Sequence, residues 1–166
     1  VDQTDGEQTI SFNINADTTC VAVYAIDTHT LTVNSTPVTG ITITGTPGDV
    51  TNYTATLDDN SLVDLTAPAT FNDGTTDYTF VRWTIDAVNQ TDGQQAISFN
   101  INADTTCVAV YAVDTHTLTV NSTPVTGITI TGTPGDVTNY SATLDDNSLV
   151  DLTAPATVAD GNADYT

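Results

Sequence analysis

The amino-acid sequence repeats itself after 87 residues. When Val1–Thr79 is aligned with Val88–Thr166, 70 of the 79 residue pairs are identical. The pairs that differ are Asp2/Asn89, Glu7/Gln94, Thr9/Ala96, Ile26/Val113, Thr54/Ser141, Phe71/Val158, Asn72/Ala159, Thr75/Asn162 and Thr76/Ala163. Near-identical tandem copies are typical of an array built from one structural unit. Copies of an enzyme site are free to diverge, whereas a fibre uses the same interface repeatedly, so the repeat favours a structural role.

The composition predicts an all-β fold. The chain has 37 threonines and 20 aspartates, but it has no lysine, no methionine and only one glutamate, Glu7. Threonine, valine, isoleucine and tyrosine favour strands, while Asp, Asn, Gly and Pro favour turns. No segment has the periodicity of an amphipathic helix.

One complete unit contains seven segments with the pattern of strands. They are His29–Ser35, Ile41–Thr44, Asn52–Leu57, Ser61–Pro68, Tyr78–Asp86, Ala96–Asn102 and Cys107–Val113. Most of them alternate apolar and polar residues, with Leu31 and Val33, for example, on one face. Turns are predicted at Thr46–Asp49, Asp58–Asn60 and Asn72–Asp77. The pattern predicts tandem immunoglobulin-like antiparallel β-sandwich repeats of 87 residues, with a mixed β-grasp type unit as the alternative.

The segment Cys107–Val113 differs from the others because it contains no polar side chain. Half of its side chains are expected to face the core of the unit, and the other half to lie against a neighbouring domain or chain. Trp83 stands among apolar residues, and we predict that it belongs to the core.

The repeat divides the chain into three parts. Residues 1–26 carry the C-terminal strands of one repeat, residues 27–113 form a complete repeat, and residues 114–166 carry the N-terminal strands of the next. Each large apolar side chain contributes roughly 1.5 to 3 kcal/mol when buried, so the last part alone would leave on the order of 10 to 20 kcal/mol unrealised. This is comparable to the stability of a whole domain. We therefore expect adjoining copies to complete both ends.

Completion can occur in two ways. The chain, which has no initiator methionine, can be a window from a longer covalent array. Alternatively, residues 1–26 of one molecule can dock onto residues 114–166 of the next by strand complementation, although the segment "FVRWTID" is then missing at the junction. Both ways predict a head-to-tail filament. The residues expected in inter-subunit strands are Ile10, Phe12, Ile14, Val21, Val23, Leu118, Val120, Ile128, Ile130, Tyr140 and Leu144.

Three short motifs mark each unit: an opening "LTV", an aromatic "FVRW" and a closing "DTTCVAVY". In these motifs the unit resembles repeat domains of archaeal and bacterial cell-surface proteins, and it is similar to divergent internalin-type B-repeats. The resemblance covers the whole 87-residue unit and implies an extracellular stalk, adhesin or filament. Its motifs are packing and turn residues, so it implies no catalytic residue.

The charge of the chain restricts its partners. The formal net charge is −20 at pH 7, and Arg82 is the only basic side chain apart from two histidines. Such a surface is incompatible with nucleic acid or an anionic membrane as a partner. No apolar run is long enough to span a bilayer, so membrane insertion is not expected. The expected partners are copies of the same chain, joined head to tail, with lateral bundling as a further contact.

The two cysteines, Cys20 and Cys107, occupy equivalent positions in the repeat. A disulfide requires Cα atoms within about 7 Å, whereas successive domains of a rod are separated by roughly 30 to 40 Å. The cysteines are therefore not expected to pair within one chain. Each is interpreted as a buried free thiol or as half of a lateral disulfide between filaments, and no CxxC spacing supports a metal site.

The sequence contains no convincing catalytic set. His29 lies near Asp27 and Ser35, and His116 lies near the equivalent residues, but each set belongs to one extended segment and lacks a nucleophile elbow. We expect no catalytic residue, no metal centre and no enzyme activity.

Oxygen-rich turns and glycosylation sequons remain as candidate sites. Oxygen ligands for calcium are offered by the loop Asn72–Asp77 and by two equivalent sets, Asp58, Asp59, Asn60 and Asp64, and Asp145, Asp146, Asn147 and Asp151, but their spacing matches no EF-hand. Five Asn-x-Ser/Thr sequons are candidates for glycosylation. They begin at Asn34, Asn52, Asn89, Asn121 and Asn139.

These observations predict a non-enzymatic structural repeat of an extracellular filament, pilus-like fibre or cell-surface stalk. Its function is mechanical, and neighbouring copies complete each other. The alternative is an adhesin or S-layer-type module that binds carbohydrate or a partner cell surface, which would need a ligand cleft with exposed aromatic side chains. The placement of Trp83 among apolar residues favours the rod.

Overall fold

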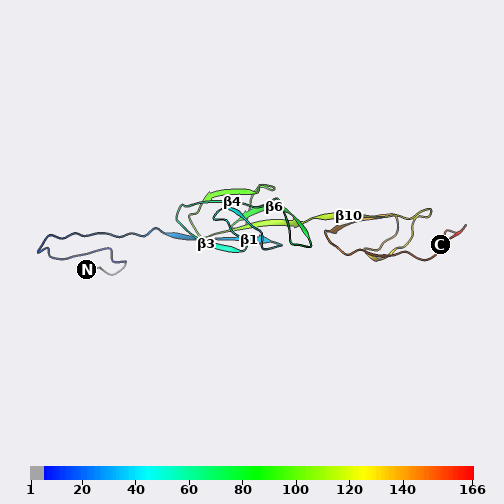
Figure 1. Ribbon diagram of the computed structural model, residues 1–166, viewed down its shortest axis with the longest axis horizontal. Helices are drawn as coiled ribbons and strands as arrows, with labels where there is room; N and C mark the ends of the chain where they lie inside the picture. The colour runs from blue at the N-terminus through cyan, green and yellow to red at the C-terminus, as the bar shows by residue number, and fades with distance from the viewer. Residues whose placement is uncertain (1–5) are drawn as a thin grey trace.

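The structure is a computed structural model that describes residues 6–166, and this part of the chain contains strands and no helix. The predicted all-β class is therefore confirmed. The molecule is elongated, with the N-terminal segment at one end and the last strands at the other (Figure 1).

The first nine strands are β1 (Thr28–Thr36), β2 (Thr44–Thr46), β3 (Tyr53–Asp58), β4 (Leu62–Thr66), β5 (Thr70–Asn72), β6 (Asp77–Ile85), β7 (Val88–Asn89), β8 (Ala96–Asn100) and β9 (Thr105–Val113). The other six are β10 (Thr115–Val120), β11 (Thr131–Thr133), β12 (Tyr140–Asp145), β13 (Asp151–Thr153), β14 (Val158–Ala159) and β15 (Asp164–Tyr165).

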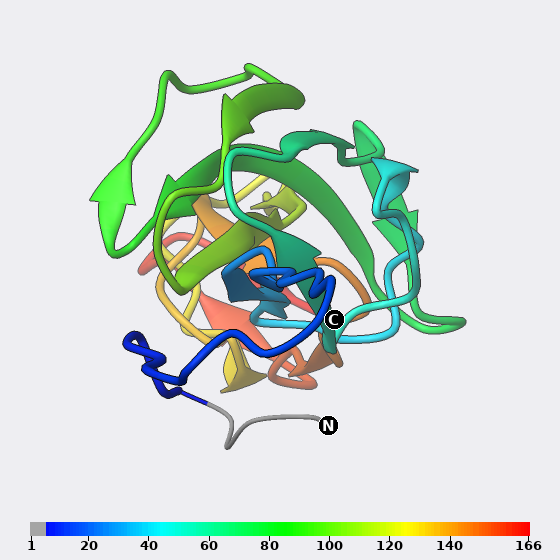
Figure 2. The same cartoon turned by 90° about the vertical axis from the view of Figure 1, so that its left-hand side faces the viewer.

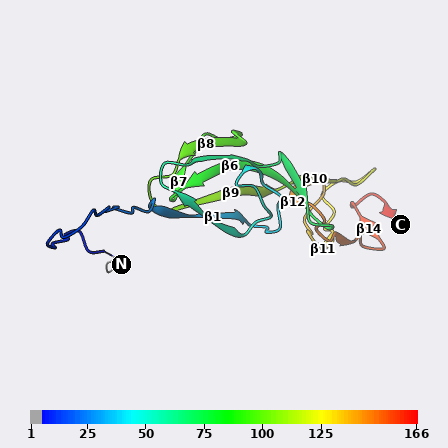
Figure 3. The ribbon, with the colours of Figure 1, turned by 60° about the vertical axis from the view of Figure 1, so that its left-hand side comes forward.

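Residues 27–113, which we call the complete unit, contain two sheets, both built from strands β1 to β9. The larger sheet has six strands in the order β3-β1-β9-β6-β5, with β7 paired to β6. The smaller sheet has the order β2-β4-β8. The larger sheet is mixed and strongly curved, so that the unit has the form of a half-barrel (Figures 2 and 3).

Alternating side chains from both sheets form a single hydrophobic core. Its fully buried members include Leu31 and Val33 from β1, Val63 and Leu65 from β4, and Trp83 from β6. The indole Nε1–H of Trp83 donates to the carbonyl of Gln95 at 2.8 Å, so the polar atom of this buried ring is satisfied. The prediction that Trp83 belongs to the core is confirmed.

The prediction of purely antiparallel pairing is wrong at the centre of the larger sheet. Strands β1 and β9 pair in parallel, from Leu31↔Thr105 to Thr36↔Val110. A parallel pair needs a long crossover, and here the chain from β2 to β8 supplies it. Mixed pairing agrees with the β-grasp alternative, but the described residues contain no helix.

The central position of β9 explains its apolar sequence. Strand β9 pairs with β1 on one side and with β6 on the other. Cys107, Ala109 and Tyr111 point into the core, which confirms the prediction for half of this segment. Val108 and Val110, on the opposite face, are half-buried within this chain. That they lie against a neighbouring domain or chain stays a prediction.

The predicted strand Ile41–Thr44 is displaced in the structure. Ile41 and Ile43 are fully buried, but the strand β2 begins only at Thr44. A bridge between Thr42 and Val50 and a bond from the amide of Ile41 to the hydroxyl of Thr51 (3.0 Å) hold the buried segment instead. The alternation therefore predicts burial correctly, while local side-chain bonds replace the regular ladder.

Residues 6–166 contain no helix that is long and apolar enough to cross a membrane.

Candidate functional site: the ends of the unit and the joint

The N-terminal segment repeats the sequence of β8 and β9 but forms no strand among its described residues. Its large apolar side chains are between 48% and 89% exposed, whereas the equivalent Ile97, Ile101 and Tyr111 are at most 5% exposed. The exposed side chains are Ile10, Phe12, Ile14, Val21, Val23, Tyr24 and Ile26. The copies of the other four, which are Phe99, Val108, Val110 and Val113, are half-buried, so the same sequence is buried or half-buried in the complete unit and exposed at the start of the chain.

The C-terminal part repeats the first half of the unit and stays open. In the complete unit β1 pairs with β3 and β9, but in the part of the chain described here its copy β10 pairs with β12 alone. Likewise β4 pairs with β2 and β8, while its copy β13 pairs with β11 alone. Two open hollows of about 220 Å³ each lie in this part. One is lined by Leu118, Leu144 and Val150, among others, and the second by Ile128, Ile130 and Val158.

The predicted inter-subunit residues of this part are therefore only partly covered. Leu118, Val120, Ile128, Tyr140 and Leu144 are half-buried. Ile130 alone among them is buried, at 8% exposure. The copies of Leu118, Val120, Ile128 and Ile130 in the complete unit, which are Leu31, Val33, Ile41 and Ile43, are at most 1% exposed. The copies of Tyr140 and Leu144, which are Tyr53 and Leu57, are half-buried there too, so these two positions show no contrast.

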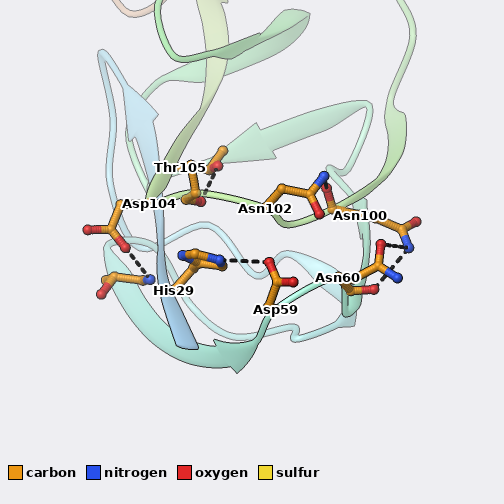
Figure 4. Close-up of polar contacts among 9 residues, drawn as sticks. His29, Asp59, Asn60, Asn100, Asn102, Asp104 and Thr105 are labelled. Atoms are coloured by element: carbon orange, nitrogen blue, oxygen red, sulfur yellow. Dashed lines mark hydrogen bonds and ion pairs between the residues drawn. The ribbon is translucent and has the colours of Figure 1, made fainter. Parts of the chain in front are cut away.

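A polar cluster occupies the end of the unit at which the chain enters β1 (Figure 4). His29 Nε2 contacts Asp59 Oδ1 at 2.9 Å, and the amide of Asp59 donates to the carbonyl of Asp27 at 2.8 Å. The amide of Thr30 donates to Asp104 Oδ1 at 2.7 Å. These bonds join the turn after β3 and the residue before β9 to the start of β1.

The same cluster recurs after β9, where it joins two units. His116 Nε2 contacts Asp146 Oδ1 at 3.0 Å, which repeats the His29–Asp59 pair. Here Asp146 Oδ2 also accepts the amide of Asp77 from the preceding unit at 2.9 Å. Asp114 is the single residue between β9 and β10, and its amide donates to the carbonyl of Asp77 at 2.9 Å.

Two further hydrogen bonds fix Asp114. The hydroxyl of Thr79 donates to Asp114 Oδ1 at 2.7 Å, and the amide of Asp146 donates to the carbonyl of Asp114 at 2.7 Å. A linker of one residue held by three hydrogen bonds leaves little freedom between the units. We call this set, Asp77, Thr79, Asp114, His116 and Asp146, the joint.

The joint has a titratable centre. The pKa of Asp146 is lowered from its usual value of 3.8, first by the amide of Asp77 and then by the hydrogen bond with His116. Bonds to the charged form of a carboxylate stabilise that form. The pKa of Asp146 in the folded protein lies below its unfolded value. The bonds to its carboxylate therefore stabilise the fold above the usual pKa, and this stabilisation is lost as the pH falls through the folded pKa.

We expect the amide proton shift of Asp77 to follow the protonation of Asp146. In an NMR titration this shift should have an inflection below pH 3.8, because the amide donates to Asp146 Oδ2. Asp146→Asn should abolish the inflection, since the side-chain amide of asparagine does not titrate in this pH range. Asp59→Asn changes the equivalent residue at the other end of the unit and should leave it in place. An inflection that survives Asp146→Asn would assign the titration to another group.

The structure disperses the residues considered for catalysis. His29 pairs with Asp59 and not with Asp27, which was its neighbour in the sequence. The hydroxyl of Ser35 bonds to the carbonyl of Val38 and to the hydroxyl of Thr51, both at 2.6 Å. Serine and histidine lie at opposite ends of β1, so this histidine cannot activate this hydroxyl.

The loop Asn72–Asp77 satisfies many of its side-chain oxygens with its own donors. Asp73 accepts hydrogen bonds from Thr75 and Thr76 and from the hydroxyl of Tyr78. These bonds lower the pKa of Asp73 to about 2, and the backbone amides of Thr76 and Thr75 have the largest effect. Among residues 6–166, no three His, Cys, Asp or Glu side chains come together as a metal site would require. Calcium binding at these turns, which the sequence suggested, stays a prediction.

The five sequons have different surroundings. Asn34 is half-buried on β1, whereas Asn89 and Asn121 are exposed. The side-chain oxygens of Asn52 and Asn139 each accept a backbone amide, at 3.2 and 3.0 Å. Asn52 and Asn139 are exposed as well, and glycosylation at any of the five stays a prediction.

The two cysteines differ in the same way as the segments that carry them. Cys20 is exposed, whereas Cys107 is buried, and burial raises the pKa of the Cys107 thiol to about 12. A lateral disulfide through Cys107 would require the unit to open, because a thiolate must reach its partner. For Cys20 the lateral disulfide stays a prediction.

Sequence reasoning found the apolar ends but missed the joint. Asp77, Asp114 and Asp146 are far apart in the sequence and have the ordinary appearance of turn residues. The short spacing between the apolar segments on either side of Asp114 was the one available signal. Comparisons of the chain with protein-family models, with curated proteins and with solved structures find no match.

Proposed function

We propose that this chain is a non-enzymatic structural repeat of an extracellular filament, pilus-like fibre or cell-surface stalk. Its units would be immunoglobulin-like in the broad sense of small β-sandwiches, arranged in tandem and completed by neighbouring copies. The observation that carries the proposal is the contrast in burial between identical sequences. Tyr24 is 89% exposed and its copy Tyr111 is 4% exposed.

The path of the chain supports a linear arrangement. Because β1 and β9 are parallel neighbours, the chain enters and leaves the unit at opposite ends. The one-residue joint at Asp114 then starts the next unit, and Figure 1 shows β10 continuing away from the complete unit. Units connected in this way extend into a rod and do not fold back on one another.

The register of the complete unit specifies how copies would complete each other. Strand β9 pairs with β1 through Cys107↔Val33, so an incoming Cys20 would lie opposite Val120. Strand β8 pairs with β4 through Ile97↔Leu65, so an incoming Ile10 would lie opposite Leu152. The incoming segment can belong to a second molecule or to a further repeat of the same chain. A further repeat of the same chain would also supply the copy of β6, whereas residues 1–26 of a second molecule bring only the copies of β8 and β9.

Electron microscopy of the purified chain tests the proposal. We expect filaments with an axial repeat of roughly 30 to 40 Å per unit, the length of a strand of nine residues with its turns. Dispersed particles at all concentrations would contradict completion between molecules.

The thiol of Cys20 provides a second, chemical test. Docking would bury it as Cys107 is buried, so its reaction with a maleimide should slow by roughly tenfold or more in the assembled fraction. Tyr24→Ala should weaken assembly and restore the reaction. Val88→Ala is the control, because Val88 is also exposed, at 64%, but lies outside the docking segment. Equal assembly by the two variants would contradict the proposed register.

A further inference from the structure

Tension applied to the two ends of the chain would act on the unit along the axes of two adjacent strands. The chain enters at the start of β1 and leaves at the end of β9, and these two strands are parallel neighbours at the centre of the six-stranded sheet. Tension between the two ends of the chain therefore pulls β1 and β9 in opposite directions along their common axis. It does not separate them sideways.

All the contacts between these strands resist such a pull together. Six residue pairs join them, from Leu31↔Thr105 to Thr36↔Val110. The bonds of a parallel ladder are evenly spaced along the strands, so sliding strains all of them at once. Each strand is also held on its other side, β1 by β3 and β9 by β6.

The core opposes sliding as well. Leu31 and Val33 on β1, and Cys107 and Ala109 on β9, are all 0% exposed. A shift by one residue, about 3.3 Å, would turn these side chains toward the outer face of the sheet. Sliding therefore requires the core to open before the chain can lengthen.

Side-chain bonds secure the two strands at the end where β9 begins. Asp104, which precedes β9, accepts the amide of Thr30 at 2.7 Å. Asp86, in the turn after β6, accepts the amide of Thr106, and its own amide donates to the carbonyl of Thr106, both at 2.8 Å. These bonds connect β1, β9 and the β6–β7 turn.

We propose that β1 and β9 form a shear clamp that lets each unit carry tension along the rod without unfolding. This inference rests on the proposed role in a filament, because only a chain held at both ends is under tension. The joint transmits the load, since a single residue connects β9 to β10 in the next unit.

Force spectroscopy on single molecules tests the clamp with one chain pulled in two directions. The exposed native Cys20 serves as the first attachment point, and the buried Cys107 does not compete for it. Ala112→Cys places the second point near the end of β9, so the pull shears β1 against β9. Ala103→Cys places it before the start of β9, so the pull peels the same strands apart one pair at a time. Both alanines are exposed.

We expect the shear direction to need a rupture force roughly threefold higher than the peeling direction, because up to six pairs must fail together. The urea midpoints of the two labelled chains, followed by the fluorescence of Trp83, should coincide, which ties the difference to the direction of pulling. Equal rupture forces would overturn the clamp and leave the proposed filament standing. If the rupture forces differ threefold but the chain forms no filaments, the clamp stands and the proposed filament is overturned.

Discussion

Tyr111→Ala is expected to lower the free energy of unfolding of the complete unit by roughly 3 to 5 kcal/mol, as for other buried aromatic side chains. Tyr111 is 4% exposed, and its ring meets that of Phe80 edge-on with centroids 5.4 Å apart. Its hydroxyl donates to the carbonyl of Pro68 at 2.8 Å. The substitution therefore leaves a cavity and removes the partner of a carbonyl.

Urea unfolding followed by the fluorescence of Trp83 measures this loss. Trp83 is the only tryptophan of the chain and lies in the same core, so the signal reports on the complete unit alone. Tyr24→Ala is the matched control, because the same local sequence surrounds an 89% exposed ring. Its unfolding free energy should equal that of the parent chain within about 0.5 kcal/mol. A similar loss from both substitutions would mean that the N-terminal segment also packs on the unit.

Gly45→Ala is expected to destabilise the unit by roughly 3 to 6 kcal/mol, because it adds backbone strain to a steric clash. Gly45 has a φ of +119°, a conformation that side chains rarely adopt. A Cβ at this position would lie 1.9 Å from the carbonyl oxygen of Asp64, on the neighbouring strand β4. Backbone cannot move aside as a side chain can, so β2 would have to separate from β4.

Gly40→Ala separates the clash from the strain. Gly40 also has a positive φ, of +81°, but a Cβ there would meet nothing within 4 Å. We expect it to cost roughly 1 to 2 kcal/mol, the usual penalty for a left-handed backbone in a residue with a side chain. The same urea titration compares both variants. Equal losses would show that β2 tolerates separation from β4 and contributes little to the unit.

Much of the fold could be predicted because burial follows a two-residue period in a strand. Alternation placed Leu31 and Val33 on one face of a strand, and both are fully buried. Local bonds were harder to predict. The segment Ile41–Thr44 alternates in the same way, yet the hydroxyl of Thr51 holds its backbone in place of a ladder.

The candidate site was predictable only where it depends on the repeat. The internal repeat predicted that both ends are incomplete, because it gives a complete unit with which to compare them. It could not predict the joint, since the bond between Asp77 and Asp146 joins residues 69 positions apart. An aspartate that accepts a distant backbone amide has the same sequence signature as an aspartate in any turn.

The sequence by itself determined the all-β class, the 87-residue period of the repeat and several of the buried residues, because composition and alternation act locally along the chain. The tertiary structure alone decided that the first and last strands of the unit lie side by side in parallel. That pairing depends on the crossover between β1 and β9, residues 37–104, and no local pattern records the direction in which two distant strands meet. The direction of the load on the unit follows from it.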